Sequence, residues 1–388
     1  MNWATSSLPL QAADEENSPI LRNAGLEIMS DDIYRKLAKV LDALPTGFPS
    51  TQSGIEIKLL EKIFTPEEAD LFCDLKLSYE TPVQIAERSG RPLEGLDELL
   101  TRMWRQKGQI EGAELGPTRV FRMLPWMVGI FEMQVDRMDE ELARLSNEYY
   151  MHFGQQFFAQ GPQALRTIPI EQDVTPTQQL LSYHRVSGII EGGQSFAVND
   201  CVCRKEERLV GNGCSYPLEV CLGIDPQAGL FERQPWGRAI SKQEAYAILD
   251  EAEAAGLVHL TSNVEKGHSF ICNCCGCCCM TLKGINKLGM SDVVNSDFYS
   301  QIDADLCDGC GNCTDDVCQV GAIREGEEAY RIDRRFCIGC GVCLGRCDRL
   351  AIELKRKSET EQVASPEDDD AWLEERGRLR GVDFSSYK

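Results

Sequence analysis

Two runs of cysteines with nearly the same spacing lie close to the end of this chain of 388 residues. Each contains Cys-x2-Cys-x2-Cys, a spacing that wraps the backbone around one face of an iron–sulfur cubane, and a fourth cysteine from the other run can complete each site. The flanks repeat too, because Ile302-Asp303 precedes the first run and Ile332-Asp333 the second. The pattern predicts two iron–sulfur clusters. The runs are Cys307, Cys310, Cys313 and Cys318, then Cys337, Cys340, Cys343 and Cys347.

Zinc is the alternative ligand for these runs, because Cys-x2-Cys pairs also build zinc ribbons. A zinc ion is bound by two such pairs, and a third cysteine at the same short spacing would not be one of its ligands. The repeated triple therefore favours iron–sulfur clusters and a role in carrying electrons.

Residues 302–354 resemble the bacterial-type two-cluster ferredoxin family, on the strength of these two runs. The resemblance implies a βαββαβ fold with pseudo-twofold symmetry and two low-potential [4Fe–4S] clusters. It also implies a crossed pattern, in which the last cysteine of each run serves the cluster of the other. One cluster would be held by Cys307, Cys310, Cys313 and Cys347, and the other by Cys337, Cys340, Cys343 and Cys318.

The sequence departs from the family pattern around the fourth cysteine of each run. The proline that usually follows this cysteine is Gln319 in the first run and Asp348 in the second. The first run also places four residues between its last two cysteines, where the family has three. Both changes alter the turn around one ligand, so we expect them to affect the potential of each cluster more than its presence.

Ten further cysteines lie upstream of the repeat, in two groups. Six of them fall within eight residues, and adjacent side chains point in different directions, so we expect this loop to be shared between two metal sites. The loop would then draw ligands from the other group, which predicts two more clusters, most simply [4Fe–4S], and about four in all. Two thiols remain surplus. The groups are Cys201, Cys203, Cys214 and Cys221, then Cys272, Cys274, Cys275, Cys277, Cys278 and Cys279.

Other interpretations of these ten cysteines stay open. They could hold a single unusual cluster, or a cluster beside a reducible dithiol that acts as a catalytic site. A zinc site formed by the Cys201–Cys221 group is a third alternative. Arg204 and Lys205 follow Cys203, where positive charge would offset an anionic cluster. Cys73 lies alone among apolar neighbours and is predicted to be structural.

The composition of the chain bears on its class of partner and on its cellular compartment. The net charge of −22 disfavours nucleic acid as a partner and suits docking on a basic patch of a redox protein, although solubility alone would also explain it. The sequence begins without a basic and then apolar leader, and lacks an apolar stretch long enough to span a bilayer. Nineteen cysteines without a secretion signal predict ligands in a reducing cytoplasm, in an anaerobic host.

The predicted fold class is α+β with several domains. A helical, winged-helix-like N-terminal part precedes an α/β cysteine-rich middle domain and a C-terminal βαββαβ two-cluster ferredoxin domain. Thr175-Pro176 predicts a helix start in the middle domain. The predicted boundaries are 1–30 for an N-terminal extension, 31–118 for the winged-helix-like domain, 119–160 for a connector helix, 161–295 for the cysteine-rich domain, 296–356 for the ferredoxin domain and 357–388 for an acidic C-terminal tail.

This order also resembles a set of multi-cluster iron–sulfur proteins from anaerobic bacteria and archaea. The residues that carry the likeness are Leu44–Pro49, Cys201-x-Cys203-Arg-Lys and the Cys272–Cys279 run. The resemblance supports the prediction of iron–sulfur clusters and does not indicate a substrate. In the tail, Ser365-Pro366 predicts a short helix to about Arg380, and the last residues are expected to be solvated, with docking on a partner as the alternative.

We interpret the chain as an electron-transfer subunit, itself not catalytic. It would relay electrons through about four clusters to or from a flavin- or metal-containing oxidoreductase, with any membrane association made through that partner. One alternative is a stand-alone reductase with its catalytic centre at Cys272–Cys279. Another is a redox-sensing regulator that uses the winged helix, although the mixed charge of its recognition helix favours protein contact over DNA.

Overall fold

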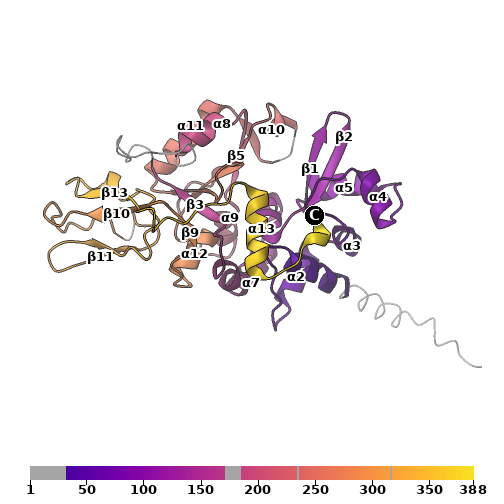
Figure 1. Cartoon of the computed structure of the whole chain (residues 1–388), viewed down its shortest axis with the longest axis horizontal. Coiled ribbons are helices and arrows are strands. Elements are labelled where there is room, and N and C mark those ends of the chain that lie inside the picture. Colours follow the sequence, from indigo (N-terminus) through magenta and orange to yellow (C-terminus); the bar gives the residue numbers. More distant parts are fainter. Residues whose placement is uncertain (1–31, 171–184, 234–235, 315–316) are drawn as a thin grey trace, which may run out of the picture.

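A computed structural model describes residues 32–170, 185–233, 236–314 and 317–388. The extension predicted for residues 1–30 and the helix start predicted at Thr175 lie outside these residues. The described chain mixes helices and β-sheets, in agreement with the α+β class. In Figure 1 the N-terminal helices lie at one end of an elongated molecule, and the small strands β10, β11 and β13 lie at the other.

The N-terminal part is a set of helices followed by a β-hairpin. Threonine residues start two of the helices: Thr65 accepts a hydrogen bond from the Glu68 amide, and Thr81 from that of Gln84, each with a proline at the next position. The elements are a helix over 32–43, α2 (Ile55–Ile63), α3 (Pro66–Phe72), α4 (Pro82–Ser89), α5 (Leu96–Arg105), and the antiparallel strands β1 (Ile110–Leu115) and β2 (Thr118–Met123).

A long helix, α7 (Glu140–Phe158), joins this part to the rest of the chain. Asp139 caps it by accepting a hydrogen bond from the Leu142 amide, and the helix packs on α2 on one side and on α9 and α12 on the other. The apolar segment before it is buried, since Trp126, Ile130 and Phe131 are at most 2% exposed. It forms the short helical elements η2 (Trp126–Ile130), α6 (Phe131–Met133) and η3 (Val135–Arg137).

A seven-stranded sheet forms the middle of the molecule, in the order β6-β4-β5-β8-β7-β3-β9. All neighbours are antiparallel except β3 and β9. The strands are β3 (Leu165–Ile168), β4 (Ser195–Asp200), β5 (Glu219–Asp225), β6 (Arg238–Ile240), β7 (Val258–Ser262), β8 (Phe270–Cys274) and β9 (Val294–Asn295). The helices of this part are α8 (Val186–Gly192), α9 (Val202–Leu209), α10 (Leu230–Arg233), α11 (Lys242–Ala254) and α12 (Met280–Asn286).

Four short strands follow, in two antiparallel pairs. The first of these strands pairs with the last, with Ile302 opposite Ile352. The second pairs with the third, with Ile323 opposite Ile332. The pairs are β10 (Phe298–Ile302) with β13 (Ile352–Arg356), and β11 (Ile323–Arg324) with β12 (Arg331–Ile332), with the 3-10 helix η6 (Leu344–Arg346) before β13.

The end of the chain folds back along the molecule. Helix α13 (Asp369–Arg380) ends where predicted, but Asp368 caps it rather than Ser365, and the short helix η7 (Ser385–Tyr387) follows. The indole of Trp372 donates to the Gln163 carbonyl at 2.9 Å, and the Leu77 amide donates to the Tyr387 carbonyl at 2.6 Å. Arg376, 1% exposed, donates to the Phe157 and Pro162 carbonyls. The expectation of a solvated end is therefore wrong, because these contacts fasten it to the N-terminal and middle parts.

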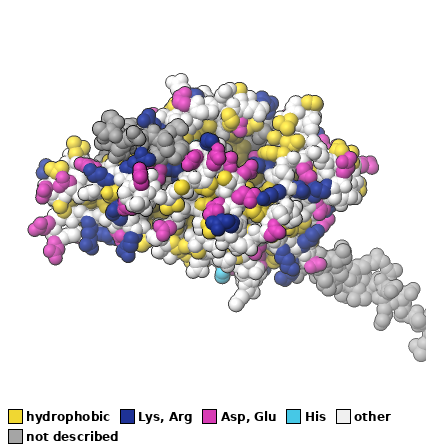
Figure 2. Space-filling view, viewed as in Figure 1, with side chains coloured by type: hydrophobic (Ala, Val, Ile, Leu, Met, Phe, Trp, Pro, Cys, Tyr) yellow, Lys and Arg dark blue, Asp and Glu magenta, His cyan; other side chains and the backbone are white. Residues whose placement is uncertain are grey.

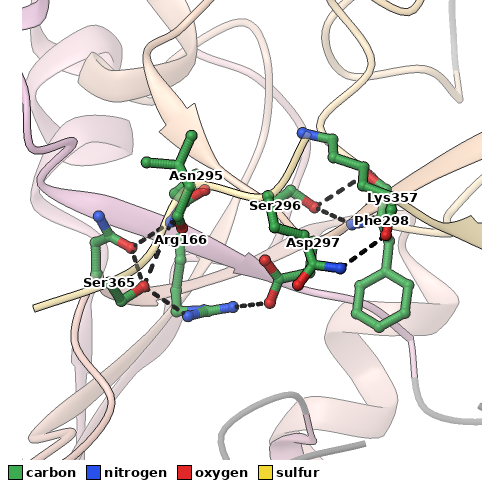
Figure 3. A network of polar contacts seen from close by, with 10 residues as sticks. Arg166, Asn295, Ser296, Asp297, Phe298, Lys357 and Ser365 are labelled. Carbon is green, nitrogen blue, oxygen red and sulfur yellow. Dashed lines mark hydrogen bonds and ion pairs between the residues drawn. The ribbon is translucent and has the colours of Figure 1, made fainter. Parts of the chain in front are cut away.

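A buried polar network ties the four short strands to the large sheet (Figure 3). Arg166 on β3 donates to the Asp297 carboxylate at 2.9 Å and to the Ser365 hydroxyl at 2.8 Å. The Arg166 side chain is 2% exposed and that of Asp297 10%. The backbone of Lys357 then donates to the Asp297 carbonyl at 2.8 Å, so one ion pair connects three segments that are distant in sequence.

We expect Arg166→Met to lower the free energy of unfolding by about 3–5 kcal/mol, because it leaves the Asp297 charge buried without its counter-ion. Urea unfolding followed by circular dichroism measures the change. Arg334→Met is the matched control: the Arg334–Glu361 pair is about half exposed on both sides and is worth at most about 1 kcal/mol. Equal losses in the two variants would contradict a fastening role for Arg166.

Candidate metal centres

One group of four thiols lines a pocket between β10, β13 and the first cysteine run. Cys307, Cys310, Cys313 and Cys347 line this pocket together with Ile302 and Tyr330. Cys310 is exposed and Cys313 is buried, so the pocket reaches the surface. We call these four residues the outer group.

A second group of four thiols lines a similar pocket. The rest of its lining is largely aliphatic and includes Val320, Ile323, Ile332 and Val342. The Cys340 carbonyl accepts a hydrogen bond from the Ile170 amide at 3.1 Å, so this pocket abuts the residues after β3. The grouping in both pockets is the crossed one that the resemblance implies. The members are Cys318, Cys337, Cys340 and Cys343, which we call the inner group.

The ten upstream cysteines separate into two unequal groups. In the first, four sulfur atoms all lie within 4.8 Å of one another. The Cys278 sulfur lies 3.5 Å from that of Cys214 and 3.7 Å from that of Cys277. Cys214 comes from the loop after α9, and the others from the loop between β8 and α12. The members are Cys214, Cys275, Cys277 and Cys278, which we call the four-thiol group.

The other six cysteines form a series in which each thiol lies within electrostatic range of the next. The series runs from Cys201 to Cys203, Cys279, Cys274, Cys272 and finally Cys221. Strand β8 ends in this series, α9 begins beside it and β5 supplies its last member. The prediction that the loop 272–279 serves two sites agrees with this geometry, but the division is six and four rather than four and four with two left over. We call these residues the six-thiol group.

Arg204 lies between the two upstream groups and is completely buried. Its Nε donates to the Cys275 sulfur at 3.4 Å, and its other nitrogens donate to the carbonyls of Pro217 and Asn273. Burial alone would lower the pKa of Arg204, but nearby thiolates, Cys201 first among them, raise it above its usual value. The hydrogen bond with Cys278, aided by the Arg204 charge, lowers the pKa of the Cys275 thiol to about 5. Arg204 therefore supplies the positive charge predicted here.

Glu132 faces the six-thiol group, and sequence reasoning missed it. Its carboxylate accepts a hydrogen bond from the Gly129 amide at 2.6 Å, and it lies within electrostatic range of Cys272 and Cys279. Burial raises the pKa of Glu132 to about 8. The sequence does contain a signal for it, because Glu132 directly follows the most apolar window of the chain. Burying a carboxyl group there costs free energy unless a nearby group stabilises it.

Gln319 connects the inner group to the loop that carries the upstream thiols. Its side-chain oxygen accepts from the Gly276 amide at 2.7 Å, and its nitrogen donates to the Tyr216 hydroxyl at 2.9 Å and to the Gly256 carbonyl at 3.0 Å. A Cβ at residue 276 would lie 1.9 Å from the Gln319 carbonyl oxygen, so the close approach requires glycine. Gln319 follows Cys318 directly, and Gly276 lies between Cys275 and Cys277.

Cys73 lies apart from all four groups, among the apolar side chains of the N-terminal part. Burial raises the pKa of its thiol to about 12, so it stays protonated at neutral pH. The prediction of a structural cysteine fits these surroundings.

The surface drawn in Figure 2 carries mixed charge, with Lys and Arg side chains interspersed among Asp and Glu over the described residues. This face therefore offers a partner alternating signs rather than one acidic block. Across the residues that the structure describes, no helix combines the length and the apolar character that crossing a bilayer demands.

Three known proteins resemble part of the chain. One component of an ion-translocating oxidoreductase complex, from Methanosarcina acetivorans, is 43% identical over 49 residues, 13% of this chain and only 18% of that component. An uncharacterized ferredoxin of Methanocaldococcus jannaschii is 38% identical over 58 residues, 14% of this chain and 74% of that protein. The PorD component of pyruvate synthase from Methanothermobacter marburgensis is 35% identical over 60 residues, 16% of this chain and 69% of that component. No family model and no solved structure matches the chain.

Proposed function

The chain belongs to the ferredoxin-type iron–sulfur proteins through a ferredoxin-like domain, and from this premise we propose that it is an electron-transfer subunit. It relays electrons between a redox partner and metal centres in its own middle part. The observation that carries the proposal is the Gln319 contact: one hydrogen bond of 2.7 Å joins the residue after Cys318 to the residue after Cys275. This contact places the inner group beside the loop that carries thiols of both upstream groups.

The proposal assigns the two-cluster ferredoxin domain to residues 296–356. The paired strands β10–β13 and β11–β12, with a cysteine run before β11 and another before β13, support the strand pairing of a βαββαβ arrangement, although the described residues of the two runs form turns and the 3-10 helix η6 rather than α-helices. The cysteine-rich domain occupies 161–295, the connector 119–160, and a winged-helix-like module 31–118. The helices of that module, with the β1–β2 hairpin that continues into the connector, suit contact with a protein partner.

We propose [4Fe–4S] clusters at the outer, inner and six-thiol groups. Both pockets of the ferredoxin domain offer four cysteine sulfurs, the donor set that such clusters take. A cubane at the six-thiol group would use four of the six thiols. The clusters supply one-electron steps, and the protein holds them in series and excludes water from the inner positions. So many free thiols suit a reducing cytoplasm.

The outer group is the proposed port for the partner. Cys310 is exposed, and two apolar side chains stand at its margin, Leu306 at 51% exposure and Leu350 at 80%. Exposed apolar side chains around a redox centre are typical of transient docking sites. The named relatives include components of oxidoreductase complexes, which favours a flavin- or metal-containing oxidoreductase as the partner.

Metal content and electron transfer of the full chain test the proposal. Purified without oxygen, it should contain about twelve irons and as many sulfides, four for each cluster. After reduction with dithionite and removal of the reductant, it should reduce an added viologen dye in stopped flow. About eight irons or fewer would remove the cluster at the six-thiol group. A chain without sulfide would overturn the electron-transfer function itself.

The six-thiol group also favours a second candidate function, a reductase that works alone. Four thiols suffice for a cubane, so two are left beside it, and Glu132 faces the same group. Such a dithiol could give two electrons and two protons to a disulfide substrate, forming its own disulfide, and the clusters would then reduce it again. Steady-state reduction of a small disulfide by the isolated chain supports this function, and a turnover of zero excludes it.

A further inference from the structure

The four-thiol group differs in geometry from every other thiol group of the chain. We propose that Cys214, Cys275, Cys277 and Cys278 bind one tetrahedral metal ion, zinc, rather than a [4Fe–4S] cluster. The proposal rests on the positions of the four sulfur atoms, all within 4.8 Å of one another.

Sulfur–sulfur distances separate the two kinds of site. A zinc–sulfur bond of about 2.3 Å in a tetrahedron places the sulfurs about 3.8 Å apart. Around a cubane each sulfur lies on a different iron, so the ligand sulfurs are roughly 6 Å apart. The measured 3.5 Å between Cys278 and Cys214 and 3.7 Å between Cys278 and Cys277 match the tetrahedron. The limit of 4.8 Å leaves no room for four irons and four sulfides between them.

The same chain supplies the comparison. In the outer and inner groups the four cysteines line an open pocket together with other side chains. Of the cysteines in those two groups, none belongs to a set that converges as the four-thiol group does.

The donor set suits a structural zinc site. Four cysteine sulfurs fill every position of a tetrahedral ion and leave none open for a substrate. Zinc with four thiolates carries a charge of −2, and the buried Arg204 guanidinium donates to the Cys275 sulfur at 3.4 Å. Asn286 also holds the loop, by donating to the Gly276 carbonyl at 2.9 Å.

The position of the ion gives it a role. Along the chain, Cys275, Cys277 and Cys278 are flanked by Cys272 and Cys274 on one side and by Cys279 on the other, and these three flanking residues belong to the six-thiol group. An ion that also binds Cys214 fixes this loop against the segment after α9. The zinc would thus position the thiols of the neighbouring redox centre without taking part in electron transfer.

Zinc and iron quantified on the same sample of the anaerobically purified full chain test the inference. The wild type should contain one zinc per chain, and X-ray absorption at the zinc edge should show four sulfur neighbours at about 2.3 Å. In Cys277→Ser, which changes the exposed member of the group, zinc should fall to a small fraction while iron stays unchanged. Cys73→Ser is the matched control and should keep both metals.

Three results would overturn the zinc site. A wild type without zinc removes it directly. A loss of about four irons in Cys277→Ser indicates a cubane, and the loss of a single iron indicates a mononuclear iron site. If the variant fails to fold, the X-ray absorption spectrum of the wild type still shows whether zinc is bound by four sulfur atoms. Sulfide content and dye reduction test the electron-transfer proposal, and zinc content tests the zinc site. Either proposal can therefore fail without the other.

Discussion

The Cys340→Ala variant should lose one whole cluster, about four irons per chain, and with it the transfer of electrons from the outer group to the middle of the molecule. Cys340 lines the inner pocket, whose other walls are mostly aliphatic. Few side chains of this lining could replace the lost thiolate as an iron ligand. The outer pocket differs, because it is open at Cys310 and has Asp308 in its lining, so Cys310→Ala should retain more of its cluster.

Iron and sulfide per chain measure this effect, together with the reduced spectrum at low temperature. Cys73→Ala is the matched control, since the Cys73 thiol lies apart from all four groups, and it should keep the full iron content. Unchanged iron in Cys340→Ala, or equal loss in both variants, would contradict the assignment of Cys340 as a ligand.

Local sequence was sufficient for the features that depend on near neighbours. Cys-x2-Cys-x2-Cys places three thiols on one turn of backbone whatever the rest of the chain does, so the outer and inner groups could be predicted. The same holds for the helix starts at Thr65 and Thr81, where the cap, the proline and the partner three residues on are all local.

The division of the ten upstream cysteines could not be predicted in this way. Cys221 joins the six-thiol group because β5 pairs with β8, and Cys214 joins the other group because the loop after α9 folds back. Both depend on sheet order and loop paths, which residue spacing does not encode. The contacts of Arg376 and Tyr387 are likewise tertiary, so the sequence suggested a solvated end where the structure has a fastened one.

Gln319 shows how a departure from a family pattern acquires meaning only in three dimensions. The missing proline suggested a change in cluster potential. In the structure, Gln319 is 9% exposed and bonds to three other segments, while Asp348, at the equivalent position of the second run, is exposed. The two departures are therefore not equivalent: one faces the cysteine loop, and the other faces solvent.

We expect Gln319→Leu to weaken the connection between the ferredoxin domain and the cysteine loop. The change leaves the Gly276 amide and the Gly256 carbonyl without their partner, at about 1–3 kcal/mol for each buried group. Local opening of the loop should then become at least about thirty times more frequent. Electrons that enter at the outer group should reach the six-thiol centre more slowly, because the loop no longer stays close to Cys318.

Hydrogen exchange at the Gly276 amide measures the opening, and stopped-flow oxidation of the reduced chain measures the transfer. Asp348→Leu introduces the same side chain at the equivalent, exposed position of the other half and should alter neither quantity. Iron content must stay at the wild-type level in both variants, which separates a lost connection from a lost cluster. Faster exchange at Gly276 with unchanged transfer would show that electrons take another route, and that the Gln319 contact only holds the domains together.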